Sequence, residues 1–373
     1  MKKVLQVVGQ LRIGGAETVA MNLYRYIDRE IFEFHYLVYG DKIGDYEEEV
    51  IRLGGKVIHI DYSAKNISGY KKDLERVFLE NGPYDIVHAH MMFHNGIVLE
   101  IAKKNNVPVR VSHAHSTNDG AIKSCAKDYV MRWIYDYYSL LKIRKNANVY
   151  IACGNEAGNY LYGREFFKRK GILIKNGIDA NKYQFDKQKR IILRKKFGLT
   201  KRHVYSCIGH FETVKNHKFL IDIFCNIYKQ DNLAYLVLLG DGRLRKEIER
   251  ICIERKIIEN VLFMGNVDNV DEWLQAIDFL IMPSLYEGIP VTLVEAQAAG
   301  VKCFVSDRIS EEVNYTNTIK YLPLENKRVW ENIVHEDAKY ERRNNKELTI
   351  NSGYDVAENV RKIQQIYLEM GVS

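Results

Sequence analysis

The sequence predicts an α/β protein with two doubly wound domains, each a parallel β-sheet covered by helices on both faces. Short apolar runs alternate with longer amphipathic stretches along the chain, and one charged stretch at residues 179–200 interrupts them. Such alternation is typical of βαβ units, whose strands are parallel and buried. A chain of 373 residues is long enough for two domains with separate cores.

In the first half, apolar runs of strand length indicate one parallel sheet. The expected strands are residues 4–8, 34–38, 56–60, 86–88, 109–112, 149–152 and 172–174. Amphipathic spacing predicts helices at residues 15–26, 70–81, 95–105 and 125–143.

The second half repeats this scheme. The expected strands are residues 204–208, 235–239, 261–263, 279–282 and 303–305. The expected helices are residues 216–228, 244–256, 270–276, 291–299 and, last in the chain, 355–370.

The domain boundary is placed in the charged stretch, where the periodicity is weakest. The expected domains are residues 1–180 and 181–350, followed by a C-terminal helix in 351–373 that crosses back to the first domain. Two such domains that face each other leave a cleft at the carboxyl ends of their strands, where ligands bind.

Composition argues against several classes of protein. No apolar run reaches the ~18 residues that span a bilayer, and the apolar part of residues 1–9 is too short for a signal peptide. The six cysteines form no C-x-x-C pair, so neither a zinc site nor a disulfide framework is indicated, and a reducing cytoplasm fits them.

The net charge of +7 is concentrated in two basic clusters. Residues 187–202 contain eight basic residues and no acidic one. The second cluster consists of Arg164, Lys168, Arg169, Lys170 and Lys175. Both are either solvated surface or sites that attract an anionic membrane or a pyrophosphate-bearing acceptor. No motif for nucleic-acid binding is present.

Residues 283–300, PSLYEGIPVTLVEAQAAG, combine the end of a strand, a loop and the start of a helix. Glu287 lies in the loop and Glu295 about one turn into the helix. A carboxylate in the helix, at Glu295, can accept hydrogen bonds from vicinal hydroxyls such as those of a ribose. A carboxylate in the loop, at Glu287, can bind hydroxyls of a second sugar. The unpaired N–H groups of the helix start suit a phosphate. The residues expected there are Gly288, Ile289, Pro290 and Val291.

This string resembles the E-x7-E signature of glycosyltransferase family 4, whose members are retaining enzymes of the GT-B fold. Similar segments in the family's order are GGAE at 14–17, IACGNEAGNYLYG at 151–163, NGID at 176–179, GDG at 240–242 and FMG at 263–265. Gly154 stands where the family usually has Ser. Residues 215–217, KNH, are similar to enzymes that build capsular or exopolysaccharide in Gram-positive bacteria.

The resemblance implies a glycosyltransferase that moves a sugar from a nucleotide donor, a UDP-sugar by expectation, with retention. Glu295 would hold the ribose and Glu287 the sugar ring. A glycan or lipid-linked acceptor would bind the N-terminal domain. Because no D-x-D is present, neither a metal nor another cofactor is expected.

Gly14 and Gly15 follow the first strand and permit a positive φ and close backbone approach. They form either a tight turn or, by the resemblance, a loop that closes the site over donor phosphate or acceptor. Loop 208–217 supplies an Arg and a Lys to the diphosphate in the family. Lys215 matches the lysine, whereas His210 replaces the arginine and brings no fixed charge when neutral.

Histidines follow two strands of the first half: His88 and His90, then His113 and His115. In the family a histidine there points at the donor sugar, and His113 and His115 are both candidates. His88 and His90 are expected to be packing or acceptor-side groups. A metal site is the less favoured interpretation, because no convergent Asp or Cys is visible.

Three other functions share parts of this pattern. A sugar-nucleotide epimerase would have the same fold but lacks such an E-x7-E string. His210 leaves open a catalytically weakened sugar-nucleotide-binding subunit. A nicotinamide-dependent oxidoreductase is disfavoured because the dinucleotide fingerprint is absent.

Overall fold

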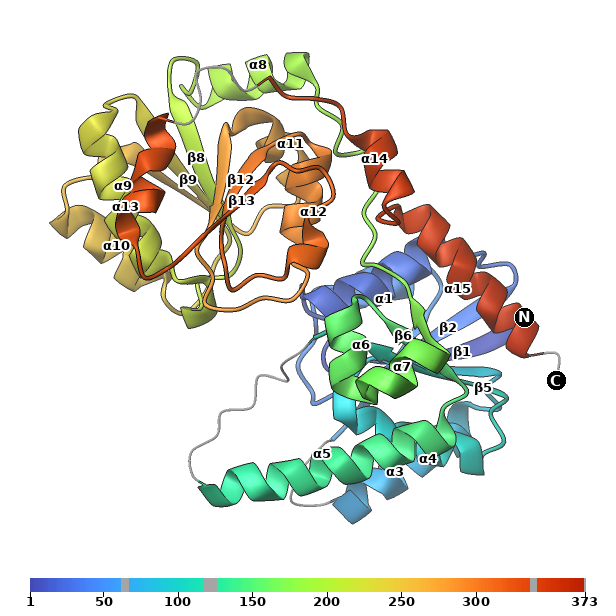
Figure 1. Cartoon of the computed structure of the whole chain (residues 1–373). Coiled ribbons are helices and arrows are strands. Elements are labelled where there is room, and N and C mark those ends of the chain that lie inside the picture. Colours follow the sequence, from blue (N-terminus) through green and yellow to red (C-terminus); the bar gives the residue numbers. More distant parts are fainter. Residues whose placement is uncertain (62–66, 117–125, 336–340, 372–373) are drawn as a thin grey trace. The chain divides into compact units, whose positions relative to one another are not determined.

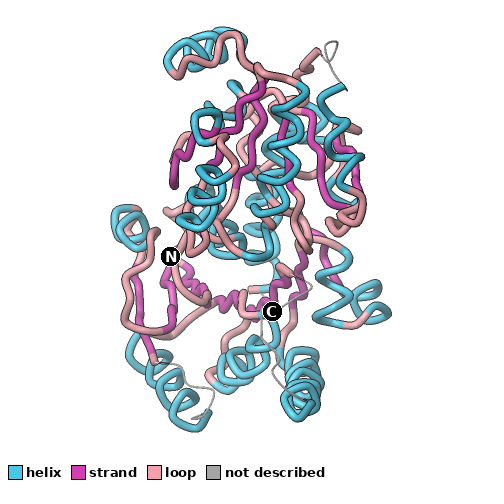
Figure 2. Tube along the Cα trace, turned by 90° about the vertical axis from the view of Figure 1, so that its left-hand side faces the viewer, coloured by secondary structure: helices cyan, strands magenta, loops and turns pink. Residues whose placement is uncertain are grey.

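The structure is a computed structural model that describes residues 1–61, 67–116, 126–335 and 341–371 (Figure 1). The chain forms two compact units. The first unit is Met1–Gly177 with Val356–Ser373, and the second unit is Ile178–Asp355. Each unit is a Rossmann-like parallel sheet, and Figure 2 shows helices around the strands of both.

The first unit contains a seven-stranded sheet with the order β3-β2-β1-β4-β5-β6-β7. All its strand pairs are parallel. The strands are β1 Lys2–Val7, β2 Phe32–Tyr39, β3 Lys56–Ile60, β4 Ile86–Ala89, β5 Val109–Ala114, β6 Val149–Ala152 and β7 Gly171–Leu173. The expected strands of the first half are therefore confirmed.

Alternate side chains of β1 point to opposite faces of this sheet, so each face has its own core. Val4 packs with residues of α1 and α15, whereas Leu5 and Val7 pack with residues of α3 to α6. The C-terminal helix α15 lies beside α1 (Figure 1). The helices of this unit are α1 Gly15–Tyr26, α2 Glu47–Arg52, α3 Ile67–Asn81, η1 Met92–His94, α4 Asn95–Lys104, α5 Ala126–Asn146, α6 Asn155–Tyr162, α7 Arg164–Lys170 and α15 Val356–Met370.

The second unit contains a six-stranded parallel sheet with the order β10-β9-β8-β11-β12-β13. The strands are β8 His203–Ile208, β9 Ala234–Leu239, β10 Val261–Gly265, β11 Phe279–Met282, β12 Lys302–Ser306 and β13 Ile319–Leu322. Residues of α9, α10 and α13 bury one face, and residues of α8, α11 and α12 bury the other. Its helices are α8 Lys187–Lys196, η2 Thr213–Lys215, α9 His217–Gln230, α10 Arg245–Glu254, η3 Ile258–Asn260, α11 Val270–Ala276, α12 Val291–Ala298, η4 Glu311–Val313, α13 Lys327–Glu331, η5 Asn332–His335 and α14 Lys346–Asn351.

Helix α8 lies in the charged stretch where the sequence predicts no helix. The Asp186 side chain caps it by accepting hydrogen bonds from two backbone N–H groups. Arg190 and Arg194 pair with Asp278 and donate to backbone carbonyls at the end of α11. Two of the eight basic residues in this cluster therefore stabilise the second unit and are not available to an external ligand.

In the described parts of the chain, six further α-helices and strands lie outside the expected set, and each is short: α2, α6, α7, β13, α13 and α14. The predicted helix 125–143 corresponds to α5, although its first residue, Cys125, lies outside the described residues. Within the described parts of the chain, none of the helices has the length and hydropathy that a membrane span requires.

Each sheet has a point at which the strand order reverses: between β1 and β4, and between β8 and β11. Parallel sheets of this kind bind ligands at the carboxyl ends of the strands beside such a point. The loops after these four strands are consequently the first places to look for a site.

Candidate active site

The loops after β8 and β11 meet at the reversal point of the second sheet. Lys215, in η2, and Glu287 form an ion pair with Nζ and Oε1 2.5 Å apart. The Ser284 hydroxyl donates to the same carboxylate oxygen at 2.9 Å. The two charged side chains are only 17% and 16% exposed. A cation and a carboxylate thus lie together where this architecture binds ligands.

Glycines let the loop after β9 support the loop after β8. Gly240 has a φ of +127°, and a Cβ there would lie 2.2 Å from the carbonyl oxygen of Gly209. A Cβ on Gly242 would lie 2.8 Å from the backbone nitrogen of Phe211. The G-D-G turn therefore fixes the backbone that carries His210 and leads to Lys215.

Helix α12 begins where the sequence predicts, with Val291 as its first residue and Pro290 as its N-cap. Its first N–H groups lack partners within the helix and carry the positive end of its dipole. A Cβ on Gly288 would meet nothing within 4 Å, so there is open space beside the helix start.

Glu295 lies in the second turn of α12 and is held by a residue that the sequence analysis did not identify. The Tyr183 hydroxyl donates to Glu295 Oε1 at 2.6 Å. Burial raises the pKa of Glu295, and the hydrogen bond from Tyr183 opposes that rise. Glu287 and Glu295 therefore have different partners, a lysine and a tyrosine.

His210 is exposed at the position where the family usually has an arginine. An arginine from the neighbouring loop borders the same segment. Arg243 Nη2 donates to Thr213 Oγ1 at 3.4 Å, and its Nε pairs with Glu212 at 2.6 Å. Arg243 therefore offers a fixed positive charge next to the loop of His210, although no motif in the sequence marks it.

The glycine loop of the first unit leads directly into α1. Gly14 is the N-cap of α1 with an extended φ of −157°, and neither Gly14 nor Gly15 has a positive φ. The two glycines therefore do not use the positive φ that glycine permits. A Cβ on Gly14 would lie 2.7 Å from the Glu17 carboxylate, the end of a flexible side chain that could move aside.

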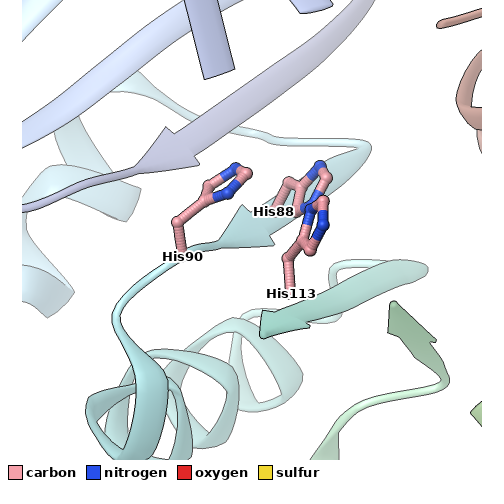
Figure 3. A group of neighbouring side chains, drawn as sticks. All are labelled: His88, His90 and His113. Carbon is pink, nitrogen blue, oxygen red and sulfur yellow. The ribbon is translucent and has the colours of Figure 1, made fainter. Parts of the chain in front are cut away.

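The four histidines lie side by side at the carboxyl ends of β4 and β5, and Figure 3 shows three of them. His88 Nε2 and His113 Nδ1 are 3.1 Å apart, and His90 Nδ1 and His115 Nε2 are 2.7 Å apart. Burial lowers the pKa of His88 and of His115 to about 3, so these imidazoles are neutral at neutral pH.

Gln6 and Tyr367 set the tautomers of this group. With the Gln6 carbonyl oxygen facing His90 Nε2 at 2.8 Å, that nitrogen donates, and His90 Nδ1 accepts from His115. The Gln6 amide donates to the Tyr367 hydroxyl, which donates to His88 Nδ1 at 2.6 Å, and His88 in turn donates to His113.

This chain of hydrogen bonds ends at two nitrogens. His113 Nε2 carries a hydrogen and His115 Nδ1 carries a lone pair, and both are buried without a hydrogen-bond partner among the described residues. The two rings stack with centroids 4.1 Å apart. A donor beside an acceptor matches a hydroxyl group, which can accept and donate.

His88, His90 and His113 are also the group whose geometry could hold a metal ion, with ligand atoms within 4.8 Å of one another. The hydrogen bonds above already occupy both ring nitrogens of His88 and His90 and one of His113. A metal would have to displace several of these bonds, so the arrangement fits a hydrogen-bonded network better than a metal centre.

Another buried histidine adjoins the site in the second unit. His217, the first residue of α9, is 2% exposed and stacks on Phe211. Both of its ring nitrogens lack a hydrogen-bond partner within the described structure. The only sequence signal was its place in the K-N-H string.

Comparison with known proteins agrees with this geometry. Residues 13–182 match the family model described as Glycosyltransferase Family 4, and residues 189–317 match the one described as Glycosyl transferases group 1. The chain is 34% identical to the putative glycosyltransferase EpsF of Bacillus subtilis (strain 168), over 98% of this chain and 96% of EpsF. It is 25% identical to the capsular polysaccharide biosynthesis glycosyltransferase CapH of Staphylococcus aureus, over 79% of each chain.

Among solved structures, Anabaena Alr3699/HepE in complex with UDP superposes with a TM-score of 0.77 at 16% identity, covering 99% of this chain and 100% of HepE. The fold, the family models and the sequence relatives together identify the chain as a GT-B glycosyltransferase, an enzyme that transfers a sugar from a nucleotide sugar. The chain belongs to glycosyltransferase family 4. The epimerase alternative is not favoured by these matches.

Proposed function

We propose that this enzyme is a retaining, metal-independent glycosyltransferase that uses a UDP-sugar and extends a polysaccharide precursor or a lipid-linked glycan. The observation that carries the proposal is the Lys215–Glu287 pair beside the start of α12. A nucleotide sugar joins hydroxyl groups to a diphosphate. A carboxylate next to a cation and a helix N-terminus matches both parts.

In the second unit, Glu295 binds the ribose hydroxyls and Glu287 binds the transferred sugar. Lys215 and the start of α12 stabilise the negative charge that grows on the diphosphate as the bond to the anomeric carbon breaks. Such electrostatic stabilisation is often the largest contribution to catalysis. The backbone expected to approach the donor is that of Gly288, Ile289, Pro290 and Val291.

The pairing of Lys215 with Glu287 gives these residues a coupled role. In the free enzyme each neutralises the other in a partly covered site. When the donor binds, the remaining ammonium hydrogens of Lys215 can reach phosphate oxygens while Glu287 accepts from sugar hydroxyls. His210 adds a hydrogen bond, and Arg243 supplies the fixed charge that His210 lacks.

In the first unit, His113 and His115 are the residues that we expect to bind a hydroxyl of the donor sugar near the reacting carbon. His115 is the better placed of the two, because it follows β5 and is half-buried, whereas His113 is 1% exposed. Gly14 and Gly15 line the site from the loop after β1. The Glu17 carboxylate beside Gly14 disfavours a phosphate there and suits hydroxyl groups.

No metal or other cofactor is required by this account. Lys215 and the helix dipole provide the positive charge that a divalent ion would otherwise supply, and the sequence has no D-x-D. We expect transfer to be unchanged by a chelator such as EDTA. Transfer that EDTA abolishes and Mg²⁺ or Mn²⁺ restores would contradict this part of the proposal.

The relatives support the donor and acceptor classes. The HepE structure contains UDP, and CapH is a glycosyltransferase of capsular polysaccharide biosynthesis. Because the two basic clusters would attract an anionic membrane surface, we place the enzyme in the cytoplasm at the inner face of the plasma membrane. The basic residues of α7 are the ones that we expect to face anionic lipid, whereas two arginines of α8 are committed to internal ion pairs.

A donor screen by thermal shift tests the proposal. UDP and UDP-sugars are expected to raise the melting temperature, whereas GDP- and ADP-sugars are not. Product from the preferred donor, examined by NMR, should keep the donor's anomeric configuration. Stabilisation by GDP-sugars alone would overturn the UDP assignment, and an inverted product would overturn retention.

A further inference from the structure

Helix α5 presents a row of apolar and aromatic side chains to solvent. The row consists of Val130, Trp133, Ile134, Tyr137, Tyr138 and Leu141, which are 43% to 67% exposed. These positions follow the spacing i, i+3, i+4, i+7, i+8 and i+11, so they form one stripe along the helix. We call it the α5 stripe.

Among the described residues, the stripe does not contribute to the core of the first unit, because the opposite side of α5 makes those contacts. Ile143 is fully buried, and Ser139 donates to the carbonyl oxygen of Phe93. Lys142 pairs with Glu100 of α4 at 2.8 Å. A surface helix usually turns polar residues outward, so an outward apolar face of this size indicates a binding partner.

The residue types in the stripe suit a lipid surface. Trp133 and Tyr137 stack with ring centroids 5.9 Å apart. Tryptophan and tyrosine have an apolar body and a polar tip, and they concentrate at the boundary between lipid tails and headgroups. Val130, Ile134 and Leu141 supply aliphatic surface beside them.

Basic residues border the C-terminal end of the stripe. Arg144 joins α5 to α7, since it donates to the carbonyl oxygen of Tyr162 and lies over the Phe166 ring. Lys145 is exposed on α5, and α7 adds four basic residues and one acidic one. A positive border beside an apolar stripe complements an anionic bilayer and opposes a second copy of this basic chain.

We propose that the α5 stripe and the basic end of α7 form a docking face for an anionic lipid bilayer, with Trp133 and Tyr137 in the headgroup region. This inference rests on the proposed membrane partner but not on the identity of the donor. It assigns the attachment to the first unit, where the acceptor is expected to bind. A lipid-linked acceptor would then remain in the bilayer while its headgroup is glycosylated.

The chain carries its own probe for the experiment. Of its three tryptophans, Trp273 and Trp330 are at most 1% exposed in the second unit, so a response to vesicles reports on Trp133. Full-length protein is mixed with phosphatidylcholine vesicles, with or without phosphatidylglycerol. We expect a blue shift of the tryptophan emission and co-sedimentation only with phosphatidylglycerol, and weaker binding in high salt.

The double variant Trp133→Ser/Tyr137→Ser should lower the partition coefficient on the order of tenfold. The matched control is Ile191→Ser/Ile192→Ser on α8, which removes two exposed apolar side chains from the second unit and should bind like wild type. Lys168→Gln/Arg169→Gln should weaken binding without removing the stripe.

Three results would overturn the proposal: no vesicle binding by wild type, equal binding by the stripe variant, or conversion of a wild-type dimer into a monomer by the stripe variant. The last result would assign the stripe to a second copy of the chain. UDP-induced thermal shifts are recorded on the same samples. If UDP produces no thermal shift in wild-type protein that still binds vesicles, the proposed donor is refuted and the docking face is not.

Discussion

Replacing Glu295 by glutamine tests the ribose assignment with little change in shape. The Tyr183 hydroxyl, now 2.6 Å from Oε1, can still donate to the amide oxygen of glutamine. The two ribose hydroxyls that are expected to donate to Glu295 would then donate to a neutral amide in place of a charged carboxylate. Hydrogen bonds to charged groups contribute about 1.5–3 kcal/mol and neutral ones about 0.5–1.5 kcal/mol, so two bonds lose roughly 2–3 kcal/mol.

That loss corresponds to a rise of about 30- to 150-fold in the Kd for UDP. Whereas the affinity for UDP should fall, the thermal stability of the Glu295→Gln protein should not. Burial raises the pKa of Glu295 in the folded state, so its ionisation costs stability at every pH above its unfolded value of about 4.5. The glutamine variant has no such cost and should be at least as stable as wild type at neutral pH.

Isothermal titration with UDP and thermal denaturation without ligand measure the two effects. The control is Glu254→Gln, an exposed carboxylate on α10 of the same unit, which should change neither. An unchanged Kd for UDP in a folded Glu295→Gln protein would refute the ribose assignment. A large drop in stability would refute the reasoning about its burial.

Four further predictions concern other parts of the site. Lys215→Met should lower kcat by about 10²-fold or more, measured as UDP release, and a change below about threefold would remove it from the diphosphate site. His210→Arg adds a fixed charge beside the diphosphate and should lower the KM for the donor, so an unchanged or higher KM would place residue 210 away from it. The pKa values of His88 and His115 are about 3 in the folded state and about 6.5 in the unfolded state, so the stability of the fold that depends on their neutral form is complete above about pH 6.5 and is lost progressively as the pH falls toward 3. The free energy of unfolding in urea should therefore decrease between about pH 7 and pH 5. An increase over this range would contradict the neutral network. Gly240→Ala places a Cβ 2.2 Å from a backbone oxygen and should lower the melting temperature and the donor affinity together, whereas wild-type values would show that the loop is not packed this tightly.

Local periodicity was sufficient to predict most of the fold. The expected strands correspond to observed ones because buried parallel strands give continuous apolar runs, as in Phe279–Met282. Helix α8 could not be predicted in this way. Its arginines are held by Asp278 and by carbonyl groups of α11, more than 80 residues away in sequence, so no local pattern shows that they are structural.

Part of the site was predictable for a similar reason. The position of Glu295 and the start of α12 follow from one continuous string. The contact of Lys215 with Glu287 spans 72 residues and depends on β8 and β11 being neighbours, which the sequence does not show. The bond from Tyr183 to Glu295 spans 112 residues and could not be found without the packed structure.

In the first unit, the positions of the histidines were predictable from the sequence, but their hydrogen-bond partners were not. The spacing of His113 and His115 predicts that both lie at the end of one strand, and both do. Their tautomers depend on Gln6 in β1 and Tyr367 in α15, which meet only because the C-terminal helix packs on the first sheet. Polar residues buried in a sheet by distant partners leave no periodic signal.

The central claim is that the donor diphosphate binds to backbone N–H groups at the start of α12 and to the loop that carries Lys215. Hydrogen–deuterium exchange of the full chain, with and without UDP, measures those N–H groups directly. We predict that UDP slows exchange in residues 209–215 and 287–293 of wild type, and much less in Glu295→Gln at the same UDP concentration. Protection confined to the first unit, with these two segments unchanged at saturating UDP, would contradict the account.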